Sequence, residues 1–162
     1  MRAEGTVKLG DETFTFRPED SFGVLDWGRG VWTYHNTWYW GSASGLVDGV
    51  DIGFNIGYGF GDTSKASENM LFYDGKCHKL DLVDFCIPEN VMDTWNMTSS
   101  DNRFRMQFTP FFNDRTDISV GIMSQHADKL FGMLNGVAIL DDGTELKIEN
   151  MPVFHERVHN KW

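Results

Sequence analysis

Residues 31–60 read VWTYHNTWYW GSASGLVDGV DIGFNIGYGF, and this stretch decides the fold. The dipeptide Asp48-Gly49 lies between two runs rich in β-branched and aromatic residues, Val31–Gly45 and Val50–Phe60. Asp-Gly is a strong hairpin signal, because both central residues of a type I′ turn need φ > 0. A two-residue loop pairs Val47 with Val50, and counting outward then predicts the register of the whole hairpin.

This register sets most of the bulky side chains opposite small ones on both faces. On one face the expected pairs are Trp38–Gly59, Trp40–Gly57 and Ser42–Asn55. On the other face the expected pairs are Ala43–Phe54, Gly41–Ile56 and Tyr39–Tyr58. The two strands are therefore complementary in shape.

The two faces differ in their chemistry. One is a continuous apolar wall of Ile52, Phe54, Ile56, Tyr58 and Phe60. The other carries tryptophans and a few polar groups above glycine backbone, which is typical of a ligand cavity, although glycines also accommodate tryptophans in an ordinary core. The candidate ligand-binding residues are Trp27, Trp32, Tyr34, Asn36, Trp38, Trp40, Ser42 and Asn55, with Asp62 at the expected rim, where a solvated loop residue is the alternative.

Composition limits the classes of function. The 162-residue chain has a formal net charge of −10, which argues against nucleic-acid binding because phosphate contacts need clustered Lys and Arg. No apolar run has the length of a membrane span, and no signal-peptide core is present near Met1. Cys77 and Cys86 lack the spacing of a metal site, so we expect a reduced, cytoplasmic setting and no cofactor.

Short strand-like runs continue along the rest of the chain. Further hairpin turns are expected at Gly10-Asp11, Asp74-Gly75 and Asp142-Gly143, and no window shows a sustained helical period. This pattern predicts a single all-β domain over residues 1–162, an antiparallel meander with few or no long helices. A meander leaves two edges, so we expect it to close into a barrel or half-barrel.

Five motifs distributed along the chain share one family pattern: Asp26–Gly30, Asn36–Gly45, Gly57–Thr63, Glu68–Lys76 and His159–Trp162. They resemble the family designated domain of unknown function 2804, over nearly the whole chain. That family is distantly similar to lipocalin-like AttH proteins and carotenoid hydratases of the hydroxyneurosporene synthase type, which have two β-barrel-like domains. The resemblance implies a lipocalin- or calycin-like barrel. It also implies that the chain is the C-terminal domain of a longer protein, with an N-terminal companion domain or a homo-oligomer partner.

Asp26 and Arg29 flank Trp27 and are the candidate catalytic residues. The simpler interpretation is an ion pair. The functional hypothesis is a carboxylic acid held among tryptophans, where desolvation raises its pKa and makes it a proton donor. The carbocation formed by protonating an alkene would be stabilised by aromatic faces such as those of Trp38 and Trp40.

The run from His155 to His159 matches HExxH in form. In zinc proteases the two histidines bind one metal from consecutive helical turns. Here the preceding Met151–Phe154 predicts extended structure, and the departure from the family at His155 creates the match, so no metal site is expected.

Three functions remain in view after these observations. The first is a module that binds an apolar or amphipathic small molecule. The second is a lyase, hydratase or isomerase acting on a polyene or terpenoid-like substrate. The third is a purely structural domain whose tryptophan face packs on an N-terminal half.

Overall fold

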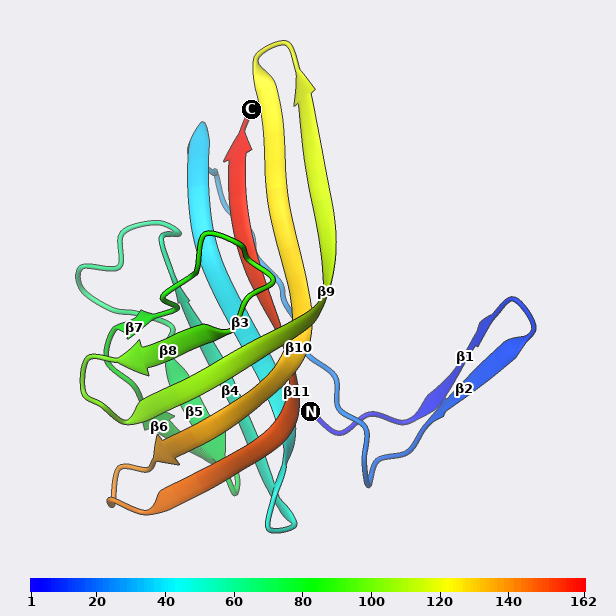
Figure 1. Cartoon of the computed structure of the whole chain (residues 1–162), viewed down its shortest axis with the longest axis vertical. Helices are drawn as coiled ribbons and strands as arrows, with labels where there is room; N and C mark the ends of the chain where they lie inside the picture. The colour runs from blue at the N-terminus through cyan, green and yellow to red at the C-terminus, as the bar shows by residue number, and fades with distance from the viewer.

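The computed structural model describes residues 1–162, and every regular element in it is a β-strand (Figure 1). The strands are β1 (Gly5–Leu9), β2 (Glu12–Phe16), β3 (His35–Val47), β4 (Val50–Tyr58), β5 (Met70–Tyr73), β6 (Lys76–Lys79), β7 (Val83–Asp84), β8 (Trp95–Ser99), β9 (Phe104–Val120), β10 (Met123–Ile139) and β11 (Glu145–Lys161). β1 and β2 form a separate hairpin. The other nine form one antiparallel sheet in the order β6-β5-β4-β3-β11-β10-β9-β8-β7.

The central hairpin β3–β4 forms in the predicted register. Asp48 and Gly49 have φ values of 51° and 79°, as a turn with two left-handed residues requires. The pairs Trp40–Gly57, Ser42–Asn55, Ala43–Phe54, Gly41–Ile56 and Tyr39–Tyr58 are all present. Turn chemistry and the alternation of large and small side chains therefore specify this part of the sheet.

The hairpin is shorter than predicted at its open end. β3 begins at His35 rather than Val31, so Trp32 and Tyr34 precede the strand. β4 ends at Tyr58, and Gly59 follows with a φ of 90°, a conformation that stops the strand. The Phe60 ring consequently lies against Trp32 and Trp38 rather than on the predicted apolar wall.

The nine-stranded sheet curls into a half-barrel, and its two edge strands follow each other in sequence. Only residues 80–82 separate β6 from β7, and the Leu80 and Ser100 amides donate to Asn69 and Leu82 carbonyls. Arg103 adds a clamp, because its guanidinium donates to the carbonyls of Lys79 and Ile139 and pairs with Asp141. The Arg103 side chain thus links the edge strand β6 to the end of β10 across the curl, and this end of the half-barrel is held nearly closed.

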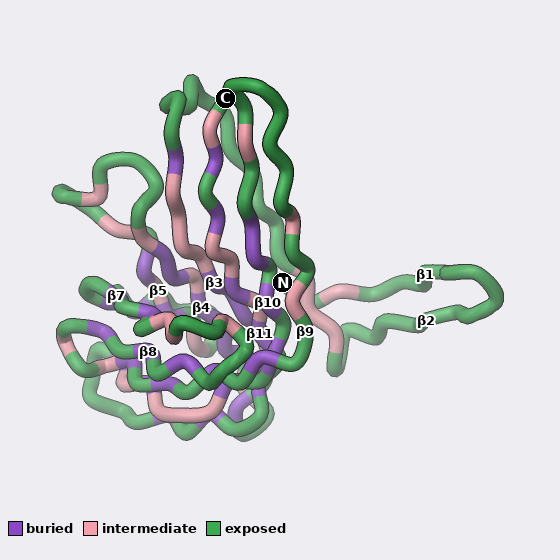
Figure 2. Tube along the Cα trace, turned by 45° about the horizontal axis from the view of Figure 1, so that its top comes forward, coloured by how far each residue is buried: buried purple, intermediate pink, exposed green.

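Apolar side chains fill the inside of the curl. Ile52, Phe54 and Ile56 project inward from β4 and are at most 3% exposed. Phe104, Met106 and Phe108 alternate inward from β9, as their pattern predicts, and the ring of Trp95 packs beside Phe108. Figure 2 shows the buried residues concentrated in the curled part of the sheet. The interior is a packed core.

Two parts of the chain extend away from this core. Beyond the curl, β3, β11, β10 and β9 continue as a four-stranded blade, because β4 and β8 pair only with the lower parts of their neighbours. The β1–β2 hairpin projects separately, and every residue in both strands is exposed. No helix in the structure has the length and apolar character needed to cross a membrane.

Candidate functional site

The tryptophans predicted to line a cavity lie on the outer face of the half-barrel. Trp38 and Trp40 alternate with residues that point into the core, so strand geometry places their rings outside. The segment 20–28 crosses this outer face in front of β3 and β4 and leaves clefts on both sides. The site is therefore an open groove between a connecting segment and the sheet, outside the packed interior.

One of these clefts has a volume of about 460 Å³, and we call it the tryptophan cleft. Five of the six tryptophans of the chain line it. Its other main side chains come from the connecting segment, the loop after β4 and strand β11. The lining residues are Val24, Leu25, Asp26, Trp27, Gly28, Trp32, Trp38, Tyr39, Trp40, Asn55, Phe60, Glu68, Glu156 and Trp162.

The structure brings some of the predicted ligand-binding residues together and separates others. Trp27, Trp32, Trp38, Trp40 and Asn55 all line the cleft. The remaining four lie elsewhere and have local structural roles.

Each of those four has partners outside the cleft. Ser42 donates to the Phe54 carbonyl, and Asn36 is bound to Thr33. Tyr34 is exposed beneath the ammonium group of Lys161. Asp62 accepts from the Ser64 amide, which lowers the pKa of its carboxyl, so it stabilises its own loop.

One hydrogen-bond chain fixes the floor of the cleft. The indole Nε1 of Trp40 donates to Oδ1 of Asn55 at 2.7 Å, and Nδ2 of Asn55 donates to Oε2 of Glu68 at 2.7 Å. The carboxylate of Glu68 lies over Gly57, where a Cβ would approach its Oε1 to 2.6 Å. The glycine opposite Trp40 therefore makes room for a carboxylate.

A second carboxylate is held beside Trp38. The indole Nε1 of Trp38 lies 3.3 Å from Oε2 of Glu156, and Nζ of Lys129 lies 3.4 Å from Oε1. The side chain of Glu156 is 13% exposed. It reaches this position because β11 pairs with β3, which sets Glu156 directly opposite Trp40.

Three aromatic rings form a corner at one end of the cleft. The Phe60 ring meets Trp32 at a centroid distance of 5.2 Å and Trp38 at 5.6 Å, both in edge-to-face geometry. In an edge-to-face pair only one of the two rings presents a face to its neighbour, so the other ring keeps both faces clear of that contact. Trp32 is 46% exposed and Trp27 is 77% exposed, so much of this aromatic surface is open.

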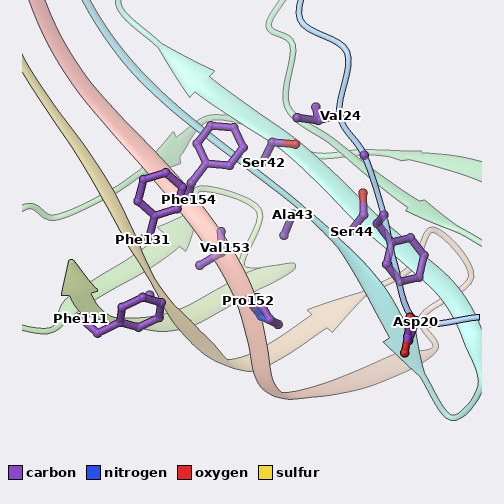
Figure 3. Close-up of a pocket in the computed structure, with 13 residues that line it drawn as sticks. Asp20, Val24, Ser42, Ala43, Ser44, Phe111, Phe131, Pro152, Val153 and Phe154 are labelled. Carbon is purple, nitrogen blue, oxygen red and sulfur yellow. The ribbon is translucent and has the colours of Figure 1, made fainter. Parts of the chain in front are cut away.

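The aromatic surface continues across the blade on the other side of the connecting segment. Trp40, Phe154, Phe131 and Phe112 follow one another at centroid distances of 4.9, 6.4 and 6.1 Å. Figure 3 shows Phe131 and Phe154 beside Ser42, with Val24 and Asp20 on the crossing segment. This second cleft has a volume of about 350 Å³ and an apolar, phenylalanine-rich wall.

The predicted catalytic residues lie on and directly after the connecting segment, Asp26 within it and Arg29 one residue beyond it. Asp26 lines the tryptophan cleft but is exposed, and Arg29 lies outside the lining. The structure shows no ion pair between them. Asp26 thus lacks the desolvated surroundings that the proton-donor hypothesis requires, and its role in catalysis stays a prediction.

The HExxH match lies on an extended strand. Both histidines are in β11, so they are not on consecutive turns of a helix. The ring of His155 is fully buried among Phe85, Trp95 and Phe108, and burial lowers its pKa to about 3. No group of three His, Cys, Asp or Glu side chains is arranged to hold a metal ion.

Two members of the cleft, Glu156 and Phe60, are not predicted by the sequence pattern, and Glu68 is expected only at the rim beside Asp62, where a solvated loop residue is the simpler interpretation. Glu156 stands out in the sequence only as part of the HExxH match. Phe60 was assigned to the opposite face because a regular strand was assumed through Gly59. Only the parity of β11 carried a signal, since Glu156 alternates with the inward residue His155.

Comparison with known proteins gives one match. A family model described as "Domain of unknown function (DUF2804)" matches residues 1–162. No curated protein and no solved structure matches the chain.

Proposed function

Since the chain belongs to the DUF2804 family, whose description assigns no activity, we propose from the geometry that it binds an apolar or amphipathic small molecule in the tryptophan cleft. The observation that carries the proposal is that five of six tryptophans line this one cleft. A folding chain ordinarily buries such side chains, because each contributes a large apolar surface. Here they surround an open space instead.

The size and composition of the cleft fit a small molecule. Its volume of about 460 Å³ lies within the usual range of ligand sites. Such sites combine an apolar lining with a few polar groups that orient the ligand. Asn55, Glu68 and Glu156 are the polar groups here, and hydrogen bonds already hold each of them in place.

Intrinsic fluorescence tests the proposal directly. Apolar ligands such as retinoids and fatty alcohols are titrated while tryptophan emission is recorded. We expect saturable quenching, with the buried Trp95 contributing a constant background.

Trp27→Ala should weaken binding without lowering stability, because Trp27 is 77% exposed. Leu82→Ala is the matched control, since Leu82 is 59% exposed and lies outside the cleft. Unchanged emission with every ligand would contradict the proposal.

The aromatic surface of the blade favours a second candidate, a structural domain that packs on a partner. Phe111 and Phe112 are 63% and 55% exposed next to the second cleft. In this proposal an N-terminal companion domain or a second copy of the chain covers that surface. Sedimentation velocity tests the second copy: Phe111→Ser and Phe112→Ser should shift an associating protein toward monomer.

A further inference from the structure

We propose that the ligand of the tryptophan cleft carries a positive charge, such as an ammonium group on an apolar body. This inference rests on the proposed function and names the chemical class of the ligand. It follows from which charges line the cleft, from what the N–H groups of Trp38 and Trp40 already bind, and from the exposed aromatic surface.

The charges at the cleft are almost all of one sign. Among its fourteen lining residues are three carboxylates, those of Asp26, Glu68 and Glu156, and no Lys, Arg or His. An acidic protein has an excess of carboxylates everywhere, but here they share one apolar groove. A fatty acid anion would face repulsion in this groove, whereas a cation would be attracted.

Two of the five indole N–H groups in the cleft, those of Trp38 and Trp40 on strand β3, are already occupied. The Trp38 N–H faces Glu156, and the Trp40 N–H binds Asn55, whose own amide donates to Glu68. Beside Trp38 and Trp40, a ligand therefore meets carboxylate oxygens and aromatic rings. Carboxylates attract a cation by charge, and the faces of tryptophan attract it through the ring quadrupole.

The corner formed by Trp32, Trp38 and Phe60 offers both kinds of contact close together. The phenyl ring packs edge-to-face with both indoles, and Nε1 of Trp38 lies 3.3 Å from the Glu156 carboxylate. Several rings set at steep angles around one space are the arrangement that recognises quaternary ammonium groups. An apolar tail has room along Val24 and Leu25.

Lys129 weakens the attraction of the cleft for a cation, so replacing it should change cation binding in the opposite direction to replacing a carboxylate. Its ammonium lies 3.4 Å from Glu156 but is not part of the cleft lining, and its side chain is 48% exposed. The Lys129 ammonium therefore neutralises part of the charge of Glu156 from outside the cleft. Removing the lysine should strengthen the binding of a cation, while removing a carboxylate should weaken it.

A series of ligands that share one chain separates the charge from the apolar contribution. Octyltrimethylammonium, octanol and octanoate are titrated by calorimetry and tryptophan fluorescence at low salt. We expect the affinity to fall in that order, and the advantage of the cation to shrink at high salt. Octanol binding alone tests the proposed small-molecule site. Equal affinity for all three, or a preference for octanoate, would overturn the charge inference and leave that site standing.

Charge-neutralising variants then locate the effect. Glu68→Gln and Glu156→Gln keep the hydrogen-bond acceptors, and each should weaken octyltrimethylammonium binding about three- to tenfold without changing octanol binding. Lys129→Gln should strengthen the cation alone. Glu149→Gln is the matched control, because Glu149 lies on the same strand outside the cleft. If Glu68→Gln, Glu156→Gln and Lys129→Gln all bind the cation as the unmodified protein does, the proposal is wrong.

Discussion

Gly41 of β3 pairs with His155 of β11, and the imidazole ring occupies the space above the bare glycine. A Cβ built on Gly41 would overlap Nδ1 of the ring. Neither ring nitrogen has a hydrogen-bond partner of ordinary geometry, although the Trp40 backbone nearby slightly favours the charged form. The core thus contains an imidazole ring that is positioned by packing against Gly41 and the surrounding aromatic rings.

Adding a methyl group at this position should destabilise the fold. In Gly41→Ala the new Cβ must displace either the His155 ring or the β3 backbone. Overpacking of this kind costs about 1–3 kcal/mol. Denaturant unfolding measures the change, with Gly23→Ala as the control, because the nearest atom to a Cβ there lies 3.9 Å away. Equal stability of the two variants would show that the sheet relaxes at Gly41.

Burial of His155 also predicts how stability depends on pH. Its pKa falls from 6.5 to about 3 in the folded protein, so between these values only the unfolded chain takes up the proton. The contribution of the neutral His155 ring to the free energy of unfolding is therefore complete above pH 6.5. It is lost as the pH falls toward 3, by about 1.4 kcal/mol per pH unit.

Comparing His155→Leu with the unmodified protein isolates that contribution from the carboxylates. The variant lacks the titrating ring, so its stability should fall less steeply between pH 6 and pH 4, by about 1.4 kcal/mol per pH unit. Denaturant midpoints at several pH values give both curves. Parallel curves would mean that the ring accepts a proton without unfolding.

The register of the central hairpin was predictable because a local signal determines it. Asp48-Gly49 defines the turn, and the pairing of Trp40 with Gly57 follows by counting. Alternation also sorted the residues of each strand into two faces. It did not show which face is inside, since both faces of β3 and β4 carry large aromatic side chains.

The carboxylates of the cleft depend on non-local pairing that no turn signal encodes. β11 pairs with β3 although more than a hundred residues separate Glu156 from Trp40 along the chain. Glu68 reaches Asn55 through an irregular loop. The position of Phe60 changed because a single backbone angle at Gly59 ended the strand. Sequence patterns of period two contain none of this information.

The clamp around Arg103 should contribute strongly to closure of the half-barrel. Its Nη1 donates to the Lys79 carbonyl at 2.9 Å, its Nε donates to the Ile139 carbonyl at 3.0 Å, and its Nη2 lies 2.6 Å from Asp141. Arg103→Met leaves these acceptors without their donor, and we expect a loss of about 2–3 kcal/mol. Thermal and denaturant unfolding give the value. The control is Arg105→Met, two residues further along and within β9, where the side chain is exposed and a change within about 0.5 kcal/mol is expected.

The projecting hairpin β1–β2 should be independent of the core in stability. Its side chains separate into a polar face and an apolar face formed by Val7, Leu9, Phe14 and Phe16, and all of them are exposed. Replacing Phe14 and Phe16 with Ser should change the free energy of unfolding by less than about 0.5 kcal/mol, whereas Phe54→Ala in the core should cost about 3–5 kcal/mol. Amide exchange gives a second measurement, because a two-stranded hairpin alone is only marginally stable and its amides should exchange long before those of β10 and β11. Slow exchange in β1, or a large loss on replacing Phe14, would show instead that this apolar face is covered by another surface in solution.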